Sequence, residues 1–398
     1  MKKIMIGLIL ALGLASVAGV THANNGQGKQ VGNVYVMDNN PSANKLVVYN
    51  RFANGRLKHV GSVLTGGDGA GNNAEADPLG SQDSIVLSEN GRVLYLVNAG
   101  SDSISVFGLT ARGWPKLRQT ISSEGDFPVS LALYNDLLYV LNAGSNGSIA
   151  GYRVARNGRL SLLEGSVRSL NTGQVGAPEG DARNIAPGDI AFDPLARRLL
   201  VPFGRGTALG EGRLLAVELG DDDLPSNAFL ETPSQGRLPF SVDFTVNGVA
   251  LVAEALGTTD GEPVSGSLSS LDFVEGAELL PLDSVDNGQI ATCWVRAGQV
   301  TDLAFTSNTN ADTMTSYRVS RSGQIMLLNE AAATDVGAPI DFALTSNDRF
   351  MYVTTSEDGG VRGYRVNLNT GALRNLGLFS GLPTFQQQGF APQGLVVR

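Results

Sequence analysis

Short apolar runs recur along the chain, and each is followed by glycine, asparagine, aspartate or serine. The clearest read LYLVN from Leu94 and LYVLN from Leu138, and after each a turn leads into a second run of alternating character. Runs of this length between turn residues are typical of β-strands. No stretch after residue 30 keeps a sustained helical period. We therefore predict an all-β fold.

The strand pattern is itself repeated. Tyr95 and Tyr139 occupy equivalent positions, and the difference of their numbers gives a period of 44 residues. Such a period is typical of β-propellers, in which each four-stranded blade is one repeat. The first strand of a unit usually opens with proline, which suits a strand start because it lacks an N–H group. Seven second strands can be counted, beginning at Val34, Leu94, Leu138, Leu199, Ala250, Leu303 and Met351.

The two ends of the chain complement each other. The first unit lacks its innermost strand, whereas the final residues, APQGLVVR from Ala391, read as an innermost strand with nothing after it. Pairing these fragments would remove the open edges that a sheet otherwise exposes. We predict a single domain over residues 33–398, a seven-bladed β-propeller whose ring is closed when the C-terminal strand completes blade one.

The N-terminus has a different character. Residues 1–23 combine two lysines, a long apolar stretch and a small final residue, the pattern of a secretory signal peptide. The alternative is an N-terminal membrane anchor. Residues 24–32 are expected to form a disordered linker. Because no later stretch is apolar enough to span a bilayer, we predict a periplasmic or secreted protein with no membrane insertion after signal cleavage.

Composition narrows the possible partners. The single cysteine, Cys293, excludes an internal disulfide, so an exported chain of this kind must be held together by packing. The formal net charge is −9, and no run of basic residues is present. Nucleic acid is therefore disfavoured as a partner, because binding phosphates requires clustered lysine and arginine. We expect a monomer that binds a small polar molecule or a protein of the cell envelope.

Two longer stretches carry a family resemblance. These are TCWVRAGQVTDLAFTSNTNADTMTSYRVSRSGQIMLL (292–328) and APIDFALTSNDRFMYVTTSEDGGVRGYRVNLNTGAL (338–373). They resemble the seven-bladed lactonase-type propellers, which include 6-phosphogluconolactonases and carboxymuconate cyclases. The resemblance extends over about 31–398 and implies the same propeller fold, together with lactone hydrolysis or cyclisation as the expected activity.

The catalytic pattern that the resemblance implies is only partly present. In typical members one blade opens with Gly-Pro-Arg-His, and its second strand ends in Asn-Glu-Leu. The matching blade here opens LPFSVDF and its second strand ends AEAL, so that Phe240 stands at the arginine position and Ser241 at the histidine position. Glu254 stands at the position of the glutamate in that pattern. Neither His22 nor His59 is expected to reach the channel, which favours a degenerate member without the usual general base.

Candidate site residues follow from propeller geometry. The start of each first strand should lie beside the end of the second strand, at one mouth of the central channel. This places Asp189, Glu254 and Asp341 at that mouth, with Arg205 near Asp189, as candidate catalytic groups or a polar-ligand site. The alternative is that these acids hydrogen-bond neighbouring strands. Candidate ligand-binding residues at the same mouth are Ser130, Ser241, Trp294 and Gln393.

Several alternatives stay open. Trp294 could stack a sugar or an aromatic ligand, or it could be a plug that packs the channel. We predict no metal site and no cofactor, apart from a weak calcium signal in the acidic turn GDDDL at 220–224. The main functional hypothesis is a degenerate lactonase-like binder of a small polar ligand or partner protein. The alternative is an active lactone hydrolase or cyclase that uses Glu254 with Asp189 or Asp341 and Arg205.

Overall fold

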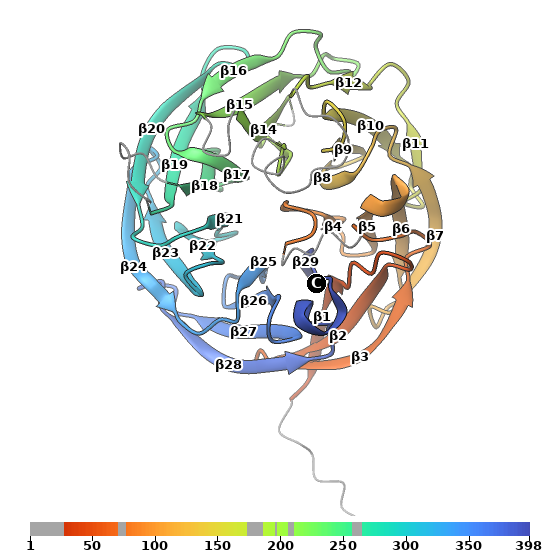
Figure 1. Ribbon diagram of the computed structural model, residues 1–398, viewed down its shortest axis with the longest axis vertical. Coiled ribbons are helices and arrows are strands. Elements are labelled where there is room, and N and C mark those ends of the chain that lie inside the picture. The colour runs from red at the N-terminus through yellow and green to blue at the C-terminus, as the bar shows by residue number, and fades with distance from the viewer. Residues whose placement is uncertain (1–27, 71–76, 173–185, 196, 206–210, 257–264) are drawn as a thin grey trace, which may run out of the picture.

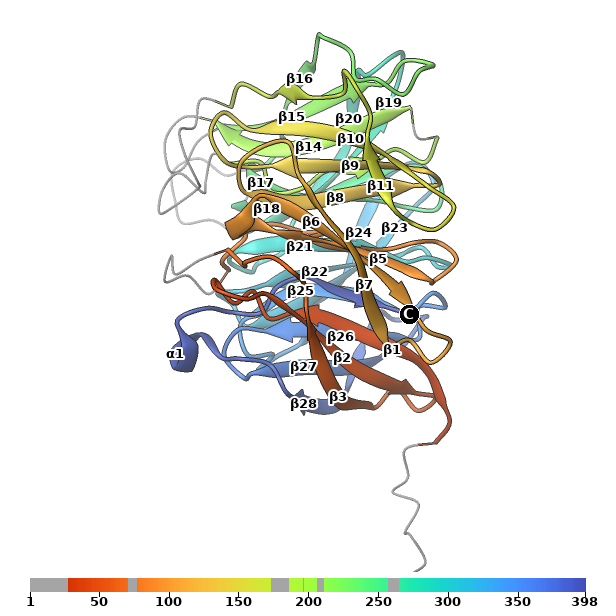
Figure 2. The same ribbon diagram turned by 90° about the vertical axis from the view of Figure 1, so that its right-hand side faces the viewer.

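The computed structural model describes residues 28–70, 77–172, 186–195, 197–205, 211–256 and 265–398. Seven antiparallel sheets are arranged around a central axis, which confirms the predicted all-β, seven-bladed propeller (Figure 1). In each blade the first strand lies next to the axis and the last strand forms the outer wall. Figure 2 shows the ring from the side, with the strands running across its thickness.

The blades are named in the order in which the ring is built. From the axis outwards, blade one contains β29 (Leu395–Val397), β1 (Gln30–Met37), β2 (Lys45–Phe52) and β3 (Leu57–Leu64). Blade two contains β4 (Ile85–Leu87), β5 (Val93–Asn98), β6 (Ser103–Leu109) and β7 (Pro115–Ser122). Blade three contains β8 (Pro128–Tyr134), β9 (Leu137–Asn142), β10 (Ser148–Val154) and β11 (Leu160–Leu162), and β12 (Arg168–Ser169) also pairs with β10.

The remaining four blades follow the same plan. Blade four contains β13 (Ala191–Phe192), β14 (Arg198–Arg205), β15 (Glu211–Glu218) and β16 (Leu230–Pro233). Blade five contains β17 (Arg237–Phe244), β18 (Ala250–Leu256), β19 (Ser267–Phe273) and β20 (Leu279–Asp286). Blade six contains β21 (Thr292–Ala297), β22 (Leu303–Asn308), β23 (Thr313–Val319) and β24 (Ile325–Ala333). Blade seven contains β25 (Pro339–Leu344), β26 (Phe350–Thr355), β27 (Gly360–Val366) and β28 (Leu373–Ser380).

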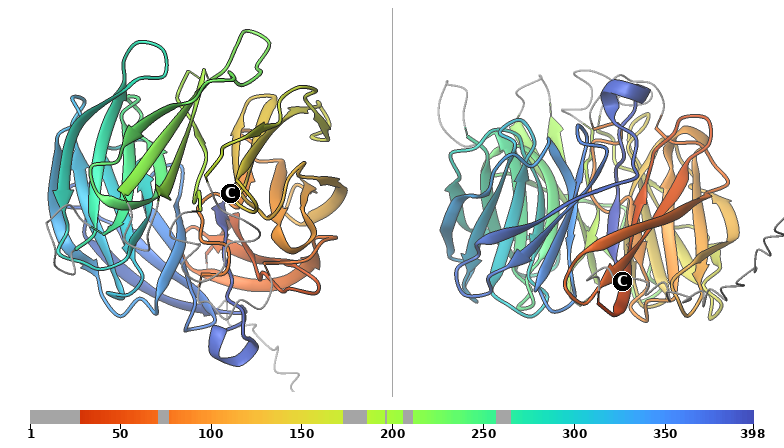
Figure 3. Two further views of the ribbon diagram at one scale, coloured as in Figure 1. Left: turned by 45° about the horizontal axis from the view of Figure 1, so that its top comes forward. Right: turned by 90° about the horizontal axis from the view of Figure 1, so that it is seen from below.

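Only two short helical segments interrupt the strands that the structure describes. They are the 3-10 turn η1 (Ala99–Ser101) and the single-turn helix α1 (Phe385–Gln388). Figure 3 shows α1 projecting from one face of the ring, in the connection from β28 to β29. Among the described residues, no helix is both long and apolar enough to cross a membrane.

The ring closes as the sequence predicts. The C-terminal strand β29 pairs antiparallel with β1, with Val34 opposite Val397 and Val36 opposite Leu395. Beyond β29, the backbone N–H and C=O of Asn33 continue the ladder with Arg398. The predicted linker over 24–32 is too long, because β1 already begins at Gln30, which lies opposite Phe52. The alternating pattern before Val34 was too weak to reveal this start of the strand.

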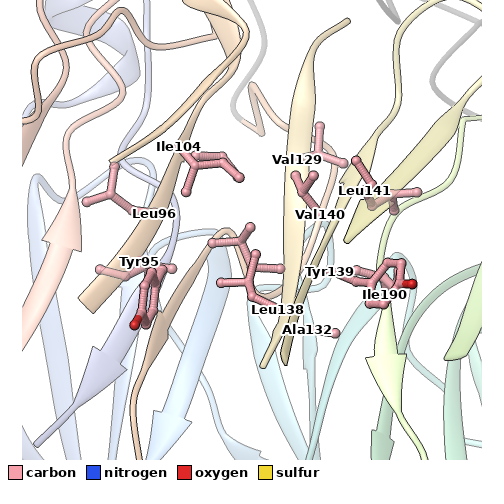
Figure 4. Packing of buried hydrophobic residues seen from close by; sticks show 14 of the residues in the cluster. Tyr95, Leu96, Ile104, Val129, Ala132, Leu138, Tyr139, Val140, Leu141 and Ile190 are labelled. Atoms are coloured by element: carbon pink, nitrogen blue, oxygen red, sulfur yellow. The ribbon is translucent and has the colours of Figure 1, made fainter. Parts of the chain in front are cut away.

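Blades pack on one another through their second strands. Every residue of β5 and β9 is buried, which explains why both strands read as unbroken apolar runs. Figure 4 shows residues of the cluster shared by blades one to four, including Leu96, Leu138 and Ile190. The outer strand β7 is buried only at Pro115, and its other positions are exposed or half-buried, because only one of its faces meets a neighbour.

The repeated tyrosine ties adjacent blades together. The Tyr95 hydroxyl of blade two donates to the Gly158 carbonyl of blade three, at 3.0 Å. The equivalent Tyr139 of blade three donates to the Asp223 carbonyl of blade four, at 2.7 Å. Burial raises the pKa of both phenols, so they stay neutral donors at ordinary pH. The tyrosine of the repeated LYLVN and LYVLN strands therefore forms a hydrogen bond to the next blade.

Candidate functional site

The mouth at the start of the first strands is filled by the chain itself. Residues 79–83, here called the axial plug, precede β4 and run into the centre of the ring (Figure 1). Ser81 and Gln82 are completely buried. The Gln82 side chain donates to the Val242 carbonyl of blade five and accepts from the Val295 N–H of blade six, both at 3.1 Å. The plug thus connects blades across the axis.

The four predicted ligand-binding residues all lie at this end of the axis and are buried. Their polar atoms are engaged within the protein. Trp294 Nε1 and Gln393 Nε2 both donate to the Ser81 carbonyl, at 2.8 and 2.7 Å. Ser130 Oγ donates to Asp189, and Ser241 Oγ donates to the Cys293 carbonyl. These groups hold the axial plug and neighbouring blades in place.

The contacts of Trp294 are those of a side chain that packs the channel. It is 1% exposed and meets the ring of Phe240 edge-on, with 4.8 Å between the ring centroids. Phe240 stands where the family resemblance leads one to expect an arginine, so an aromatic contact occupies that position. Burial raises the pKa of the adjacent Cys293 thiol, which disfavours the thiolate form that a nucleophile requires.

Asp189 acts as a node between blades. Its carboxylate accepts from Ser130 Oγ and the Ile190 N–H, both at 2.8 Å. It also accepts from the Val242 N–H at 2.9 Å and from Gln82 Nε2 at 3.1 Å. Burial raises the pKa of Asp189 well above its ordinary value, although these hydrogen bonds oppose the shift. Asp189 therefore hydrogen-bonds neighbouring strands, as the alternative interpretation of these acids predicts.

A group of charged side chains surrounds the last residue of the plug. Asp83, Asp243, Arg296 and Asp341, here called the axial charge cluster, come from blades two, five, six and seven. Arg296 forms a two-pronged ion pair with Asp83, with N–O distances of 2.7 and 2.9 Å, and lies 3.5 Å from Asp341 Oδ1. Its Nε also donates to the Phe342 carbonyl at 3.1 Å. One guanidinium therefore meets several carboxylates in a buried setting.

Burial controls the ionisation of this cluster. It raises the pKa of Asp341 to about 7 and that of Asp243 to about 6, while Arg296 opposes both shifts. Burial alone would lower the pKa of Arg296, but the carboxylates of Asp83 and Asp341 raise it above its ordinary value. The arginine stays charged, whereas two of its acidic neighbours titrate near neutral pH. Such values are typical of groups that can exchange protons at a site.

Glu254 does not join this cluster. Its carboxylate accepts from the hydroxyls of Ser234, Ser267 and Ser269 and from the Gly236 N–H, at 2.5 to 2.7 Å. Burial raises its pKa, and these donors oppose the shift. Asp83 and Arg296 act electrostatically on both Asp189 and Asp341, whereas the largest influences on the pKa of Glu254 are burial and its hydrogen bonds. Of the three predicted acids, the structure therefore brings Asp189 and Asp341 together and leaves Glu254 apart.

The repeat explains the position of Glu254. It lies opposite Pro239, just as Asn142 lies opposite Pro128, at the end of a second strand. In blade two, Asn98 donates to the hydroxyls of Ser103 and Ser105 on the third strand of its own blade. Glu254 meets Ser267 and Ser269 on β19 in the same way, but as an acceptor. Its contacts are those of a residue that fastens strands together.

Two further predicted features have limited structural support. Arg205 ends β14 opposite Glu211, and its side chain lies outside the described residues. The acidic turn at 220–224 is engaged by arginines, since Asp221 pairs with Arg197 and Asp223 pairs with Arg153. Within the described part of the chain, no group of three histidine, cysteine, aspartate or glutamate side chains is placed to hold a metal ion.

An open hollow lies on the other side of the axial plug. It has a volume of about 700 Å³ and is lined by the first strands of all seven blades. Asp83, Asp243 and Arg296 line its inner end, and Tyr134 is among the residues of its outer part. Sequence reasoning missed Asp243 and Arg296. Each is a charged residue near the end of an otherwise apolar inner strand, in SVDF and WVRA, and that interruption was the available signal.

Comparisons with known proteins agree with this architecture. The family described as lactonase, 7-bladed beta-propeller, matches residues 34–176 and 287–384. The comparison with curated proteins gave no match. The periplasmic gluconolactonase of Pseudomonas aeruginosa superposes with a TM-score of 0.69 at 16% identity, covering 92% of this chain and 98% of that one. A Bacteroides fragilis protein provisionally named a 6-phosphogluconolactonase gives 0.66 at 15% identity, with the same coverage.

Proposed function

Because the chain belongs to the lactonase family of seven-bladed β-propellers, we propose that it is a binding member of that family. In this proposal it holds a small polar molecule in the axial hollow instead of hydrolysing a lactone. One observation carries the proposal. The axial plug occupies the mouth at which the family resemblance places the reaction, and the candidate ligand groups there hydrogen-bond the plug or one another.

The chain also lacks the base that the resemblance implies. Of its two histidines, His22 lies outside the described residues and His59 lies on the outer strand β3, where its ring meets Tyr49 at 5.4 Å. Ser241, at the histidine position, donates to the Cys293 carbonyl. A hydroxyl cannot act as a general base near neutral pH without a partner that removes its proton.

The hollow defines the class of ligand. Carboxylates of Asp83 and Asp243 line its inner end, and apolar residues such as Ile85 and Leu131 line its sides. Carboxylates accept hydrogen bonds and attract positive charge. The ligand that fits best is a small molecule with hydroxyl or ammonium donors at one end and an apolar face. The volume of the hollow, about 700 Å³, lies within the usual range for small-molecule sites.

We also propose that the protein acts in the periplasm or outside the cell. The support comes from residues 1–23, whose lysines and apolar stretch read as a signal peptide. Fractionating cells that express the full chain, together with mass measurement of the product, would test this. Recovery of the uncleaved chain in the cytoplasm would contradict it.

Thermal-shift measurements test the binding function. Sugar lactones, polyols, sugar acids and small amines would be screened, because a ligand that binds only the folded state raises Tm. A shift that is lost in Asp243→Asn and retained in Asp272→Asn is the expected result. Asp272 is an exposed residue of β19, so it controls for loss of charge alone. Equal shifts in both variants would place the ligand elsewhere, and turnover of a lactone that depends on Asp243 would overturn the binding proposal.

One observation favours hydrolysis as a second candidate. The pKa of Asp243 is raised to about 6, and this residue lines the hollow. A carboxyl group with such a pKa can act as an acid or a base near neutral pH. If this candidate is right, lactone opening followed by acid release will show a pH dependence near 6 that Asp243→Asn abolishes. Glu254→Gln would leave that pH dependence in place.

A further inference from the structure

Three arginines gather where the first and last blades meet. Arg51 of blade one and Arg349 and Arg365 of blade seven line a single cavity of about 510 Å³, together with Asn347 and Phe350. These five residues are here called the seam groove. No carboxylate belongs to its lining. A neighbouring cavity of about 460 Å³ shares Arg365, adds Arg374, and likewise has no acidic residue in its lining.

Some guanidinium groups of the ring are neutralised by a carboxylate of the chain. Within the described residues, ion pairs of this kind are formed by Arg153, Arg197, Arg198, Arg213, Arg296, Arg318 and Arg362. Within the described residues, Arg51, Arg349 and Arg365 form no ion pair. Arg51 Nη2 donates to the main-chain oxygen of Arg398 at 3.1 Å, but its Nε is buried without a hydrogen-bond partner.

A buried aromatic ring positions one arginine of the groove. Arg365 lies over the ring of Phe350, with its guanidinium carbon 5.3 Å from the ring centroid. Phe350 and Arg365 lie opposite each other on β26 and β27, and the Val366 N–H donates to the Arg349 carbonyl. This pairing holds Arg349, just before β26, beside β27, and it sets the Arg365 guanidinium over the buried ring of Phe350.

Ring closure assembles the groove from distant parts of the chain. The Tyr352 hydroxyl of β26 donates to the Gly55 carbonyl in the turn after β2, at 2.9 Å. Figure 1 shows β1, β2 and β3 beside β26, β27 and β28 at this junction. Because Arg51 is separated from Arg349 by most of the sequence, no basic run announces the groove, although the folded chain concentrates positive charge there.

We propose that the seam groove binds a small organic anion with two or more carboxylate or phosphate groups. Guanidinium groups recognise these oxyanions through two parallel N–H···O bonds. Like charges that lie close together repel, and an anion between them removes that repulsion. No carboxylate lines this cavity, so a bound anion would supply the counter-charge that the chain itself does not place there. The cavity is large enough for a small molecule but not for an extended polymer.

Titration calorimetry on the full chain at low salt tests the proposal. The probes are citrate for carboxylates and inorganic pyrophosphate for phosphates, and acetate serves as a single-carboxylate comparison. We expect at least one of the first two to bind, and acetate to bind at least about tenfold more weakly. Which of the two binds more tightly identifies the oxyanion class. No binding of either probe at millimolar concentration would overturn the proposal.

Variants locate the site. Arg349→Gln and Arg365→Gln should each weaken binding by about tenfold or more. Arg321→Gln, which removes an exposed arginine from the turn between β23 and β24, should leave binding unchanged. Arg365→Lys keeps the charge and loses the planar fork, so it should also weaken binding. Equal weakening by Arg321→Gln would show a general charge effect and contradict the site. Asp243→Asn should have no effect, which separates this site from the axial hollow.

Discussion

Two regions of the propeller concentrate charge in opposite ways. At the axis, Arg296 is 15% exposed and pairs with Asp83 and Asp341, so positive and negative groups meet at the centre of the ring. In the seam groove, Arg349 and Arg365 line a cavity without any carboxylate. Charges that neutralise each other hold blades together, whereas charges without an internal partner are available to a ligand. Mutation of Arg296 at the axis should therefore act mainly on stability, and mutation of the seam arginines mainly on binding.

The strongest test of this contrast removes the arginine of the axis. Arg296→Leu should lower the free energy of unfolding by about 3–5 kcal/mol, because it leaves buried carboxylates without their partner. Urea unfolding followed by tryptophan fluorescence measures this. Arg318→Leu is the control, since the ion pair of Arg318 with Asp302 is largely exposed and should contribute less than about 1 kcal/mol. Similar losses in both variants would contradict the structural role of the axial charge cluster.

The pH dependence of stability tests the same cluster. The pKa of Asp341 is about 7 in the folded state and 3.8 ordinarily, so the folded chain holds a proton that the unfolded chain has lost. The resulting stabilisation is present at low pH and is lost as pH rises towards 7. Between pH 5 and pH 8 this residue should lower stability by about 2–3 kcal/mol. The fall should be smaller in Asp341→Asn, and an unchanged slope there would refute the assignment.

Glu254 offers a test of intermediate size, away from both regions. Glu254→Gln replaces an acceptor oxygen with a donor amide opposite three hydroxyls and an N–H. The unsatisfied groups should cost about 1–3 kcal/mol. Glu278→Gln, at an exposed position of the same blade, should change little. Chemical denaturation measures the free energy of unfolding of both variants. Equal values for Glu254→Gln and Glu278→Gln would show that the hydrogen bonds of Glu254 do not support the fold.

The smallest effect is expected at the seam groove. Arg349→Gln should change the free energy of unfolding by no more than about 0.5 kcal/mol, because this exposed side chain has no internal ion pair to lose. Thermal unfolding without added anion measures it. A loss comparable to that of Arg296→Leu would mean that the seam arginines are structural, and the contrast between the two regions would disappear.

Local pattern was sufficient to predict the strands and the ring. Tyr95 and Tyr139 mark equivalent strands because every blade repeats the same sequence of buried and exposed positions. The closing strand after Ala391 was also readable, since an unpaired inner strand at one end matched a missing one at the other. These features depend on neighbours in sequence or on a regular period, and both are visible without coordinates.

Contacts across the ring were decided only by the tertiary structure. The prediction placed Glu254 with Asp189 and Asp341, because strand ends in different blades look alike in sequence. The fold turns Glu254 towards serines of its own blade and the preceding connection, and it brings Asp83 to Arg296, 213 residues away in the chain. A period specifies which residues are equivalent, but the direction of each side chain at the axis depends on what fills the centre.

The axial plug and the seam groove illustrate this limit most clearly. The entry of residues 79–83 into the channel follows from hydrogen bonds to five other blades, which only the closed ring provides. Arg51 and Arg349 become neighbours for the same reason. The sequence by itself determined the blades and their number, because burial repeats along the chain. The tertiary structure decided which charges meet, because that depends on closing the ring.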